Sequence, residues 1–266
     1  MIIIGEQINA TRSDIKPIIE NHREDKLIEL AQKLAKAGAT YIDVNIGTGS
    51  GTSNDEVDDM RWAVKTIGDK IDIPLCLDSA DAAVLEAGLE ARESKPAMIN
   101  STKAEKKHLE RIVPMAKRYN AKLVALAMDE SGIPKTPEGR LAACRKVADW
   151  CTKCDVPMKN VFFDPLVLPV SAGPMQGLLT LNTLASIKKE FSEAKTVIGL
   201  SNVSFGLPAR AILNAAFLQM AMYAGLDAAI MDPLNETLMQ AVRTGEALVG
   251  KDRHFRKYSR KFRRKN

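Results

Sequence analysis

The chain has 266 residues, 45% of them hydrophobic and 27% charged, as is typical of a globular protein. No apolar stretch reaches the ~18 residues of a membrane span, and the N-terminus lacks the basic and apolar regions of a secretion signal, so we expect a cytoplasmic protein with no membrane partner. The net charge is +5, but residues 251–266 hold nine Lys/Arg and one Asp, which leaves −3 on the rest. We therefore predict a body that does not bind nucleic acid and a separate basic tail at 251–266, which either contacts an anionic partner or is a frayed terminus.

Hydrophobic periodicity predicts eight strands, each followed by a helix. The strands are expected at residues 2–8, 40–46, 73–77, 97–99, 122–128, 160–163, 196–200 and 228–231, and the helices at 25–37, 55–67, 80–91, 103–119, 138–154, 178–191, 209–224 and 235–249. Gly38 and Gly225 are expected to be left-handed caps that end two of these helices. Strict alternation predicts a parallel sheet. Eight units predict closure into a (β/α)8 TIM barrel at residues 1–250, with an open doubly wound sheet as the alternative.

Short polar motifs occur at the ends of seven of the predicted strands. They are Glu6-Gln7-Ile8-Asn9, Asp43-Val44-Asn45, Asp78-Ser79, Asn100-Ser101-Thr102, Asp129, Asp164-Pro165 and Ser201-Asn202-Val203-Ser204. In a barrel, the carboxyl ends of all strands meet at one mouth, where active sites lie. Each motif alone could be a helix N-cap, for which Asp, Asn and Ser are favoured. Because five Asp or Asn residues recur at this position, we expect one shared polar site.

The residue types at the strand ends restrict the chemistry of this site. None of the three histidines, His22, His108 and His254, lies at a strand end, so we predict neither a metal centre nor a Ser-His-Asp triad. Residues 47–51, GTGSG, match no phosphate-binding glycine motif and are predicted to be a mobile lid. The spacing of Cys151 and Cys154 has no second ligand pair, so these are expected to be core cysteines. Carboxylates and amides together suit a flat heterocycle with N–H donors and carbonyl acceptors.

Five segments together resemble the pterin-binding methyltransferases, namely the methyltetrahydrofolate–corrinoid protein methyltransferases and the folate-binding module of cobalamin-dependent methionine synthase. The segments are IGEQIN at 4–9, CLDS at 76–79, MINST at 98–102, FDPL at 163–166 and GLSNVSFGLPAR at 199–210. The resemblance covers nearly the whole chain before the tail. It implies a barrel like that of dihydropteroate synthase, but the chain lacks that enzyme's asparagine-rich first-strand motif and its C-terminal Arg-x-His.

Carried over position by position, the resemblance implies a role for each strand-end residue. Asp164 would take the exocyclic amine and adjacent ring N–H of a pterin, Asp78 and Asn100 the remaining ring nitrogens and the carbonyl, and Asn202 the N5 atom. The other implied pocket residues are Glu6 and Arg210, the loop-shaping Ser201 and Gly199, and the secondary candidates Asp43, Asn45 and Met128.

The resemblance further implies methyl transfer between N5 of tetrahydrofolate and the cobalt of cobalamin carried by a separate corrinoid protein, with the enzyme as a homodimer. The direction is left open: methylcorrinoid protein to tetrahydrofolate in demethylation, or the reverse in acetyl-CoA synthesis. Since N5 leaves well only when it carries positive charge, Asn202 and Asp78 are the catalytic candidates, Asn202 as a hydrogen-bonding group and Asp78 as the holder of a proton-delivering water. Dihydropteroate synthase and a non-catalytic folate-binding barrel are the alternatives.

Overall fold

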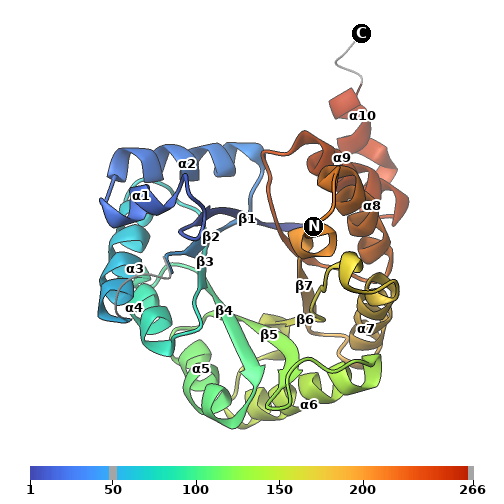
Figure 1. Ribbon diagram of the computed structural model, residues 1–266, viewed down its shortest axis with the longest axis horizontal. Helices are drawn as coiled ribbons and strands as arrows, with labels where there is room; N and C mark the ends of the chain where they lie inside the picture. Colours follow the sequence, from blue (N-terminus) through green and yellow to red (C-terminus); the bar gives the residue numbers. More distant parts are fainter. Residues whose placement is uncertain (48–52, 263–266) are drawn as a thin grey trace.

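The computed structural model describes residues 1–47 and 53–262. Eight parallel strands close into a barrel in chain order, so the predicted barrel is confirmed and the open sheet is wrong (Figure 1). The strands are β1 (Ile2–Asn9), β2 (Tyr41–Asn45), β3 (Leu75–Asp78), β4 (Ala97–Ala104), β5 (Lys122–Asp129), β6 (Val161–Asp164), β7 (Lys195–Gly199) and β8 (Ala228–Met231).

Helices α2 to α9 form a ring outside the sheet (Figure 1). The helices are α1 (Lys16–Glu20), α2 (Glu24–Ala37), α3 (Ser53–Gly68), α4 (Ala82–Arg92), α5 (Lys106–Arg118), α6 (Pro137–Lys153), α7 (Gln176–Glu190), α8 (Arg210–Tyr223), α9 (Glu236–Leu248) and α10 (Arg256–Phe262), with short 3-10 turns η1 (Met158–Asn160), η2 (Val170–Ala172), η3 (Leu200–Ser204) and η4 (Arg253–Phe255). Gly38 has a φ of +106° directly after α2, and Gly225 has a φ of +109° one residue beyond Ala224, which caps α8. Both glycines are therefore left-handed residues at helix ends, as predicted. Only glycine adopts this conformation without strain.

The largest departure from the predicted boundaries lies between the fourth strand and the helix that follows it. The fourth strand was expected to end at residue 99 and its helix to begin at 103, but β4 continues to Ala104 and α5 begins at Lys106. Residues 102 and 103 pair in register with Ala125 and Leu126 of the long neighbouring strand β5. These extra ladder bonds outweigh the helical preference that the local sequence shows, because β pairing depends on a partner distant in the chain.

A single layer of side chains fills the barrel at mid-height. It consists of one buried residue from each strand: Ile4, Tyr41, Cys76, Met98, Val124, Phe162, Val197 and Ala228. Outward-facing strand residues such as Ile42, Leu75 and Ile99 belong to a second cluster shared with the helices. The inner layer separates the mouth, at the carboxyl ends of the strands, from the opposite end, which we call the barrel bottom.

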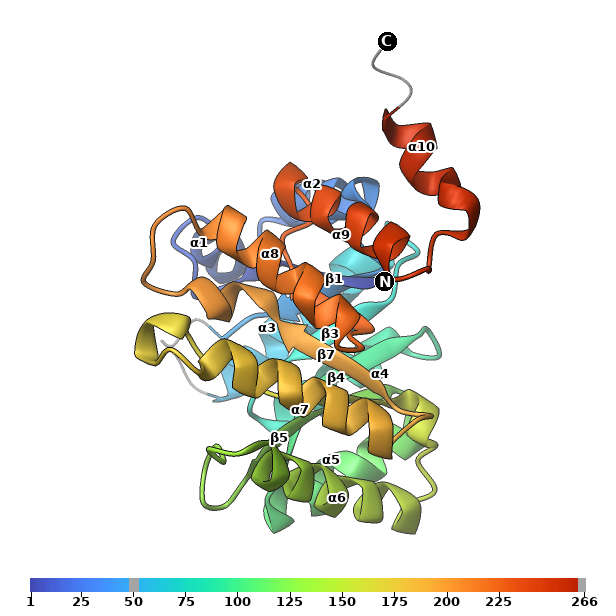
Figure 2. The ribbon, with the colours of Figure 1, turned by 90° about the vertical axis from the view of Figure 1, so that its right-hand side faces the viewer.

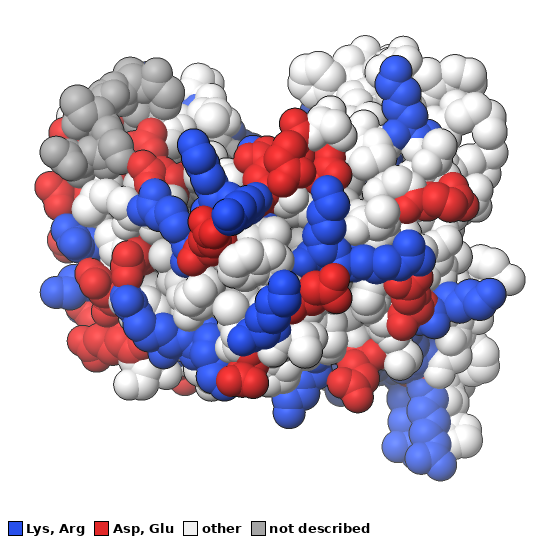
Figure 3. Space-filling view, turned by 90° about the horizontal axis from the view of Figure 1, so that it is seen from below, with Lys and Arg blue, Asp and Glu red and all other residues white. Residues whose placement is uncertain are grey.

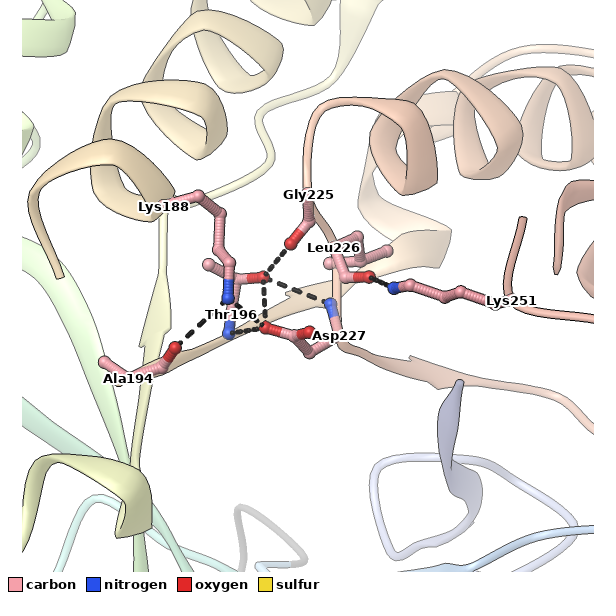
Figure 4. Close-up of polar contacts among 7 residues, drawn as sticks. All are labelled: Lys188, Ala194, Thr196, Gly225, Leu226, Asp227 and Lys251. Atoms are coloured by element: carbon pink, nitrogen blue, oxygen red, sulfur yellow. Dashed lines mark hydrogen bonds and ion pairs between the residues drawn. The ribbon is translucent and has the colours of Figure 1, made fainter. Parts of the chain in front are cut away.

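At the barrel bottom, β7 and β8 are tied together by a polar cluster (Figure 4). The Oδ2 atom of Asp227 accepts hydrogen bonds from Lys188 Nζ at 2.9 Å and from the Thr196 backbone N–H at 3.1 Å. The Thr196 hydroxyl donates to the Gly225 carbonyl at 2.9 Å. The charge of Lys188 is thus balanced where α7 packs on the sheet.

The four cysteines are free thiols, and Cys76, Cys144 and Cys151 are buried. Across residues 1–47 and 53–262, no group of three or more His, Cys, Asp or Glu is placed to hold a metal ion. No helix in the same ranges is long and apolar enough to cross a membrane. On the side of the molecule that carries α5 and α6, Lys/Arg and Asp/Glu side chains are interspersed (Figure 3).

The basic tail begins as ordered structure. The two Asp252 oxygens accept the backbone N–H groups of Lys257 and Tyr258 and so start α10, which projects away from the barrel (Figure 2). The division of the chain at residue 250 stays a prediction. Residues 263–266 of the tail, and residues 48–52 of the segment predicted as a lid, lie outside the described part of the chain.

Candidate active site

Strand register brings four of the polar strand ends to one level of the mouth. Asn9 of β1 pairs with Asn45 of β2, Asn45 with Asp78 of β3, and Asp78 with Asn100 of β4. Asn45 Nδ2 donates a hydrogen bond to Asp78 Oδ2 at 2.9 Å. The structure therefore places two of the predicted pterin ligands, Asp78 and Asn100, side by side and gives Asn45 the role of orienting one of them.

Asp164 ends β6 on the other side of the mouth and is buried. Its Oδ1 accepts the Leu166 N–H at 2.7 Å. Burial raises the pKa of Asp164 to about 7, and this shift is opposed by the Leu166 hydrogen bond and by nearby Arg140. The Arg140 guanidinium donates to the carbonyls of Pro165 and Leu166 at 2.6 and 2.7 Å and so fixes the turn that presents Asp164. Sequence reasoning missed Arg140, because nothing distinguishes it from a surface arginine of a helix.

A third group of residues comes from β1, η3 and α8. The Ser201 hydroxyl donates to Glu6 Oε1 at 2.6 Å, and Arg210 Nη2 donates to the Ser201 carbonyl at 2.7 Å. Burial raises the pKa of Glu6, and the Ser201 hydrogen bond opposes this shift. These contacts fix the short turn that carries Asn202, whose side chain is exposed in the mouth.

Gly199 has a steric reason to be glycine. A Cβ atom at this position would lie 3.1 Å from Asn202 Nδ2, closer than ordinary van der Waals contact. The predicted loop-shaping role of Gly199 therefore has a specific form here, since the absence of a side chain leaves space for the Asn202 amide.

A cavity of about 500 Å³ opens at the mouth. The predicted residues that line it are Glu6, Asp43, Asp78, Gly199, Ser201, Asn202 and Arg210. Asn45 contacts Asp78 and does not line the cavity. Asn100, which lies within β4 because that strand continues to Ala104, and Asp164 at the end of β6 are both buried, and neither lines this cavity. Met128 of β5 is half-buried and does not line the cavity, and nothing in the structure ties it to the site.

Asp43 lies in the floor of the site. It is 3% exposed, and its Oδ1 has no hydrogen-bond partner within the described residues. Burial and the neighbouring Asp78 carboxylate raise the pKa of Asp43, and burial also raises the pKa of Asp78. Two adjacent buried carboxyls do not readily ionise together, so this floor can hold a proton and still accept hydrogen bonds from a ligand.

The structure adds residues that the sequence reasoning missed. Asp232 lines the cavity directly after β8, in a Met231-Asp232-Pro233 segment that repeats the pattern of Asp164-Pro165. The strand-end rule would have found it. Asn214 also lines the cavity, is 5% exposed and has an unpartnered Oδ1, but it lies inside α8, where no sequence signal distinguishes it.

Solved structures share this architecture. Dihydropteroate synthase of Yersinia pestis with a pterine-sulfa conjugate matches with a TM-score of 0.70 over 94% of this chain and 93% of that chain, at 17% identity. The same enzyme with a sulfonamide drug matches at a TM-score of 0.70 and 16% identity. At these identities the likeness establishes the fold.

Sequence comparison is more specific. The chain is 33% identical over 265 residues to methylcorrinoid:tetrahydrofolate methyltransferase of Eubacterium limosum, covering 99% of this chain and 96% of that protein. It is 29% identical over 244 residues to methionine synthase of Mycobacterium tuberculosis, covering 87% of this chain but only 20% of that longer protein. Residues 5–232 match the family described as pterin binding enzymes. The stretch from β1 to Asp232 contains every polar strand end described above, and the chain therefore belongs to the pterin-binding enzyme family.

Proposed function

We propose that this protein is a methyltransferase that moves a methyl group between N5 of tetrahydrofolate and the cobalt of a corrinoid protein, in the direction from methylcorrinoid protein to tetrahydrofolate. The observation that carries this proposal is the similarity to a methylcorrinoid:tetrahydrofolate methyltransferase over practically the full length of both chains. The site geometry supports it independently, and the unpaired cysteines are in keeping with a reducing, cytoplasmic location.

The strand ends provide a complementary edge for a pterin ring. Asp164 in its ionised form accepts two parallel N–H bonds, one from the exocyclic amine and one from the adjacent ring nitrogen. Asp78 and Asn100, paired in register across β3 and β4, serve the remaining ring nitrogens and the carbonyl. The mouth cavity of about 500 Å³ falls within the ~300–1,000 Å³ typical of small-molecule sites.

Asn202 is the residue we assign to N5. Its amide is exposed in the mouth, and the Glu6–Ser201–Arg210 contacts brace the turn that holds it. An amide cannot supply a net proton, but it can hydrogen-bond N5 as charge changes there, which is the kind of preorganised stabilisation that lowers barriers. Asp78, whose pKa burial raises, holds or hands on the proton through water.

The corrinoid supplies the cobalt centre that gives up the methyl group. A corrin macrocycle with its substituents is too large for a cavity that suits a pterin, so the partner protein has to present the cobalt at the rim of the mouth. The residues of this chain then hold tetrahydrofolate with N5 facing outward. They also keep the pterin edge on the buried side, away from water.

We also propose that the protein forms a homodimer through the outer face of α8. Ile212, Met220 and Tyr223 lie on one side of this helix, and Tyr223 is 86% exposed. Exposed apolar patches of this kind mark interaction surfaces. Light scattering on the purified protein tests this, with Tyr223→Glu expected to produce monomers; a wild-type protein that is monomeric at micromolar concentration would contradict the proposal.

The proposed activity is tested by mixing enzyme, tetrahydrofolate and methylcob(III)alamin without oxygen and following the absorbance of cob(I)alamin. We expect cob(I)alamin to form with the wild type and hardly at all with Asn202→Ala, while tetrahydrofolate binding, measured by calorimetry, is retained. If free methylcobalamin is inert, the assay is repeated with methylated corrinoid proteins. Folate binding without methyl transfer from any of them would identify a folate-binding barrel. Condensation of p-aminobenzoate with a pterin pyrophosphate would identify a dihydropteroate synthase.

A further inference from the structure

Two lysines point into the barrel at its bottom, on the far side of the buried layer from the mouth. Lys122 at the start of β5 pairs in register with Met98, and Lys195 at the start of β7 pairs with Phe162. Met98 and Phe162 belong to the inner layer. Because residues in register on neighbouring parallel strands face the same side of the sheet, Lys122 and Lys195 enter the lower opening of the barrel.

Neither ammonium group has a counter-charge. Within residues 1–47 and 53–262, no carboxylate lies within ion-pair distance of Lys122 or Lys195, and Lys122 makes only a long hydrogen bond of 3.4 Å to Asn160 Oδ1. Both Nζ atoms instead lie over the ring of Phe162, 6.0 and 5.5 Å from its centre. Lys188 at the same end differs, since it is paired with Asp227 at 2.9 Å (Figure 4).

The cations at this end repel one another. Burial, Lys195 and Lys159 all lower the pKa of Lys122, in that order. Half-buried like charges without a partner destabilise a fold unless something of opposite charge balances them. Lys188 is balanced by the Asp227 carboxylate. No carboxylate of the described residues plays the same part for Lys122 or Lys195.

A cavity of about 620 Å³ lies at the barrel bottom. Lys122 lines it directly, whereas Lys195 does not line it and approaches from the same Phe162 ring that both Nζ atoms contact. The cavity is lined by Tyr41, Lys122 and Asn160 from the strand ends and by the turns that precede β4 and β5. Tyr41 is 8% exposed, and its phenol group lines this cavity. Asn160 accepts from Lys122 through Oδ1, which leaves its amide N–H groups available. The cavity thus combines positive charge with unused hydrogen-bond donors. Glu93, which is exposed, also lines the cavity.

We propose that the barrel bottom is a second ligand site, which binds a small multiply charged anion bearing a phosphoryl group. The ammonium groups of Lys122 and Lys195 provide the charge, and Tyr41 and Asn160 donate hydrogen bonds to phosphoryl oxygens. A phosphoryl group fits better than a single carboxylate because it carries up to two negative charges and accepts bonds from several directions. The site is independent of methyl transfer at the mouth, from which the inner layer separates it.

Calorimetry and thermal unfolding with pyrophosphate test this site, with sodium chloride at matched ionic strength as the reference. The variants are Lys122→Met and Lys195→Met, which keep the aliphatic stem, and Lys106→Met as a control on the exposed start of α5. We expect pyrophosphate to raise the unfolding midpoint of the wild type and of the control, since a ligand of the native state stabilises it. Lys122→Met and Lys195→Met, the two bottom variants, should each bind pyrophosphate roughly tenfold more weakly than the wild type, as expected for losing one hydrogen bond to a charged group. Tetrahydrofolate affinity should be unchanged in all of them.

Three results would overturn the proposal. One is the absence of a pyrophosphate effect beyond that of sodium chloride. Another is an equal pyrophosphate response in the bottom variants and the wild type, or its disappearance when tetrahydrofolate saturates the mouth, which would place the anion there. The last is an unfolding midpoint of Lys122→Met below that of the wild type without pyrophosphate, since removing an unbalanced cation should not destabilise the fold.

Discussion

The two ends of the barrel are built on the same eight strands and yet differ in the ionisable side chains that point into them. At the mouth, Asp43, Asp78 and Asp164 collect carboxyl groups whose pKa values burial raises. At the bottom, the ammonium groups of Lys122 and Lys195 lie over the Phe162 ring, and no carboxylate of residues 1–47 and 53–262 lies within ion-pair distance of them. At both ends, the protein supplies too few hydrogen-bond or charge partners for its buried polar groups. Sites of this kind are where ligands of complementary chemistry bind. The mouth is suited to a ring rich in N–H donors and the bottom to an anion.

The largest effect that would test the mouth side of this comparison comes from Asn202→Ala. We expect methyl transfer to slow by roughly 10²–10³-fold, by analogy with the loss of one oxyanion-hole donor. Single-turnover absorbance of cob(I)alamin measures it, with Asn182→Ala on the exposed face of α7 as the control. Full activity of Asn202→Ala with folate bound would remove this residue from the reaction.

Asp164→Asn tests whether a carboxylate is needed at the pterin edge. Replacing it with an amide leaves one acceptor for two N–H groups, so we expect tetrahydrofolate to bind roughly 10- to 100-fold more weakly, as for other bonds to charged groups. Calorimetry at pH 8, where Asp164 is ionised, is the measurement. Asp149→Asn, on the exposed part of α6, provides the matched control. Unchanged affinity in Asp164→Asn would place the pterin elsewhere in the mouth.

The same carboxyl predicts a pH dependence of stability. The pKa of Asp164 is raised from 3.8 to about 7, so the native state holds a proton that the unfolded chain has lost. The free energy of unfolding should therefore fall as pH rises from about 4 to 7, by at most about 1.4 kcal/mol per pH unit from this group. Urea unfolding of the ligand-free protein measures the slope, and Asp164→Asn should flatten it. A slope that is the same in both proteins would contradict the assignment.

The smallest expected effect is that of Gly199→Ala. The new methyl group would lie 3.1 Å from Asn202 Nδ2, so the amide must shift by a few tenths of an ångström. We expect a several-fold loss of turnover with little change in tetrahydrofolate affinity, because misplacing a positioned group affects the transition state most. Gly177→Ala, where the nearest atom would be at an ordinary 3.6 Å, is the control. Equal turnover of the two variants would show that the loop accommodates the methyl group.

The sequence by itself determined the fold and most of the mouth. Eight alternating strands and helices predict closure into a barrel. In a parallel barrel all strands run toward the same mouth, and this geometry places Asp78, Asn100, Asp164 and Asn202 at one end of the molecule. The same rule would have found Asp232, which directly follows the last strand. Such features are local and repeat along the chain, so they can be read without knowing which strands pair.

Other features depended on contacts between distant segments, and only the tertiary structure decided them. Pairing with β5 extended β4 to Ala104, and packing between α8 and the mouth placed Asn214 in the cavity. Charge balance depends on tertiary contacts most of all. Lys188 and Lys122 look alike in the sequence, yet one meets Asp227 and the other faces Phe162 and a second lysine. Whether a buried charge is compensated depends on neighbours brought close by folding, and no local pattern along the chain records them.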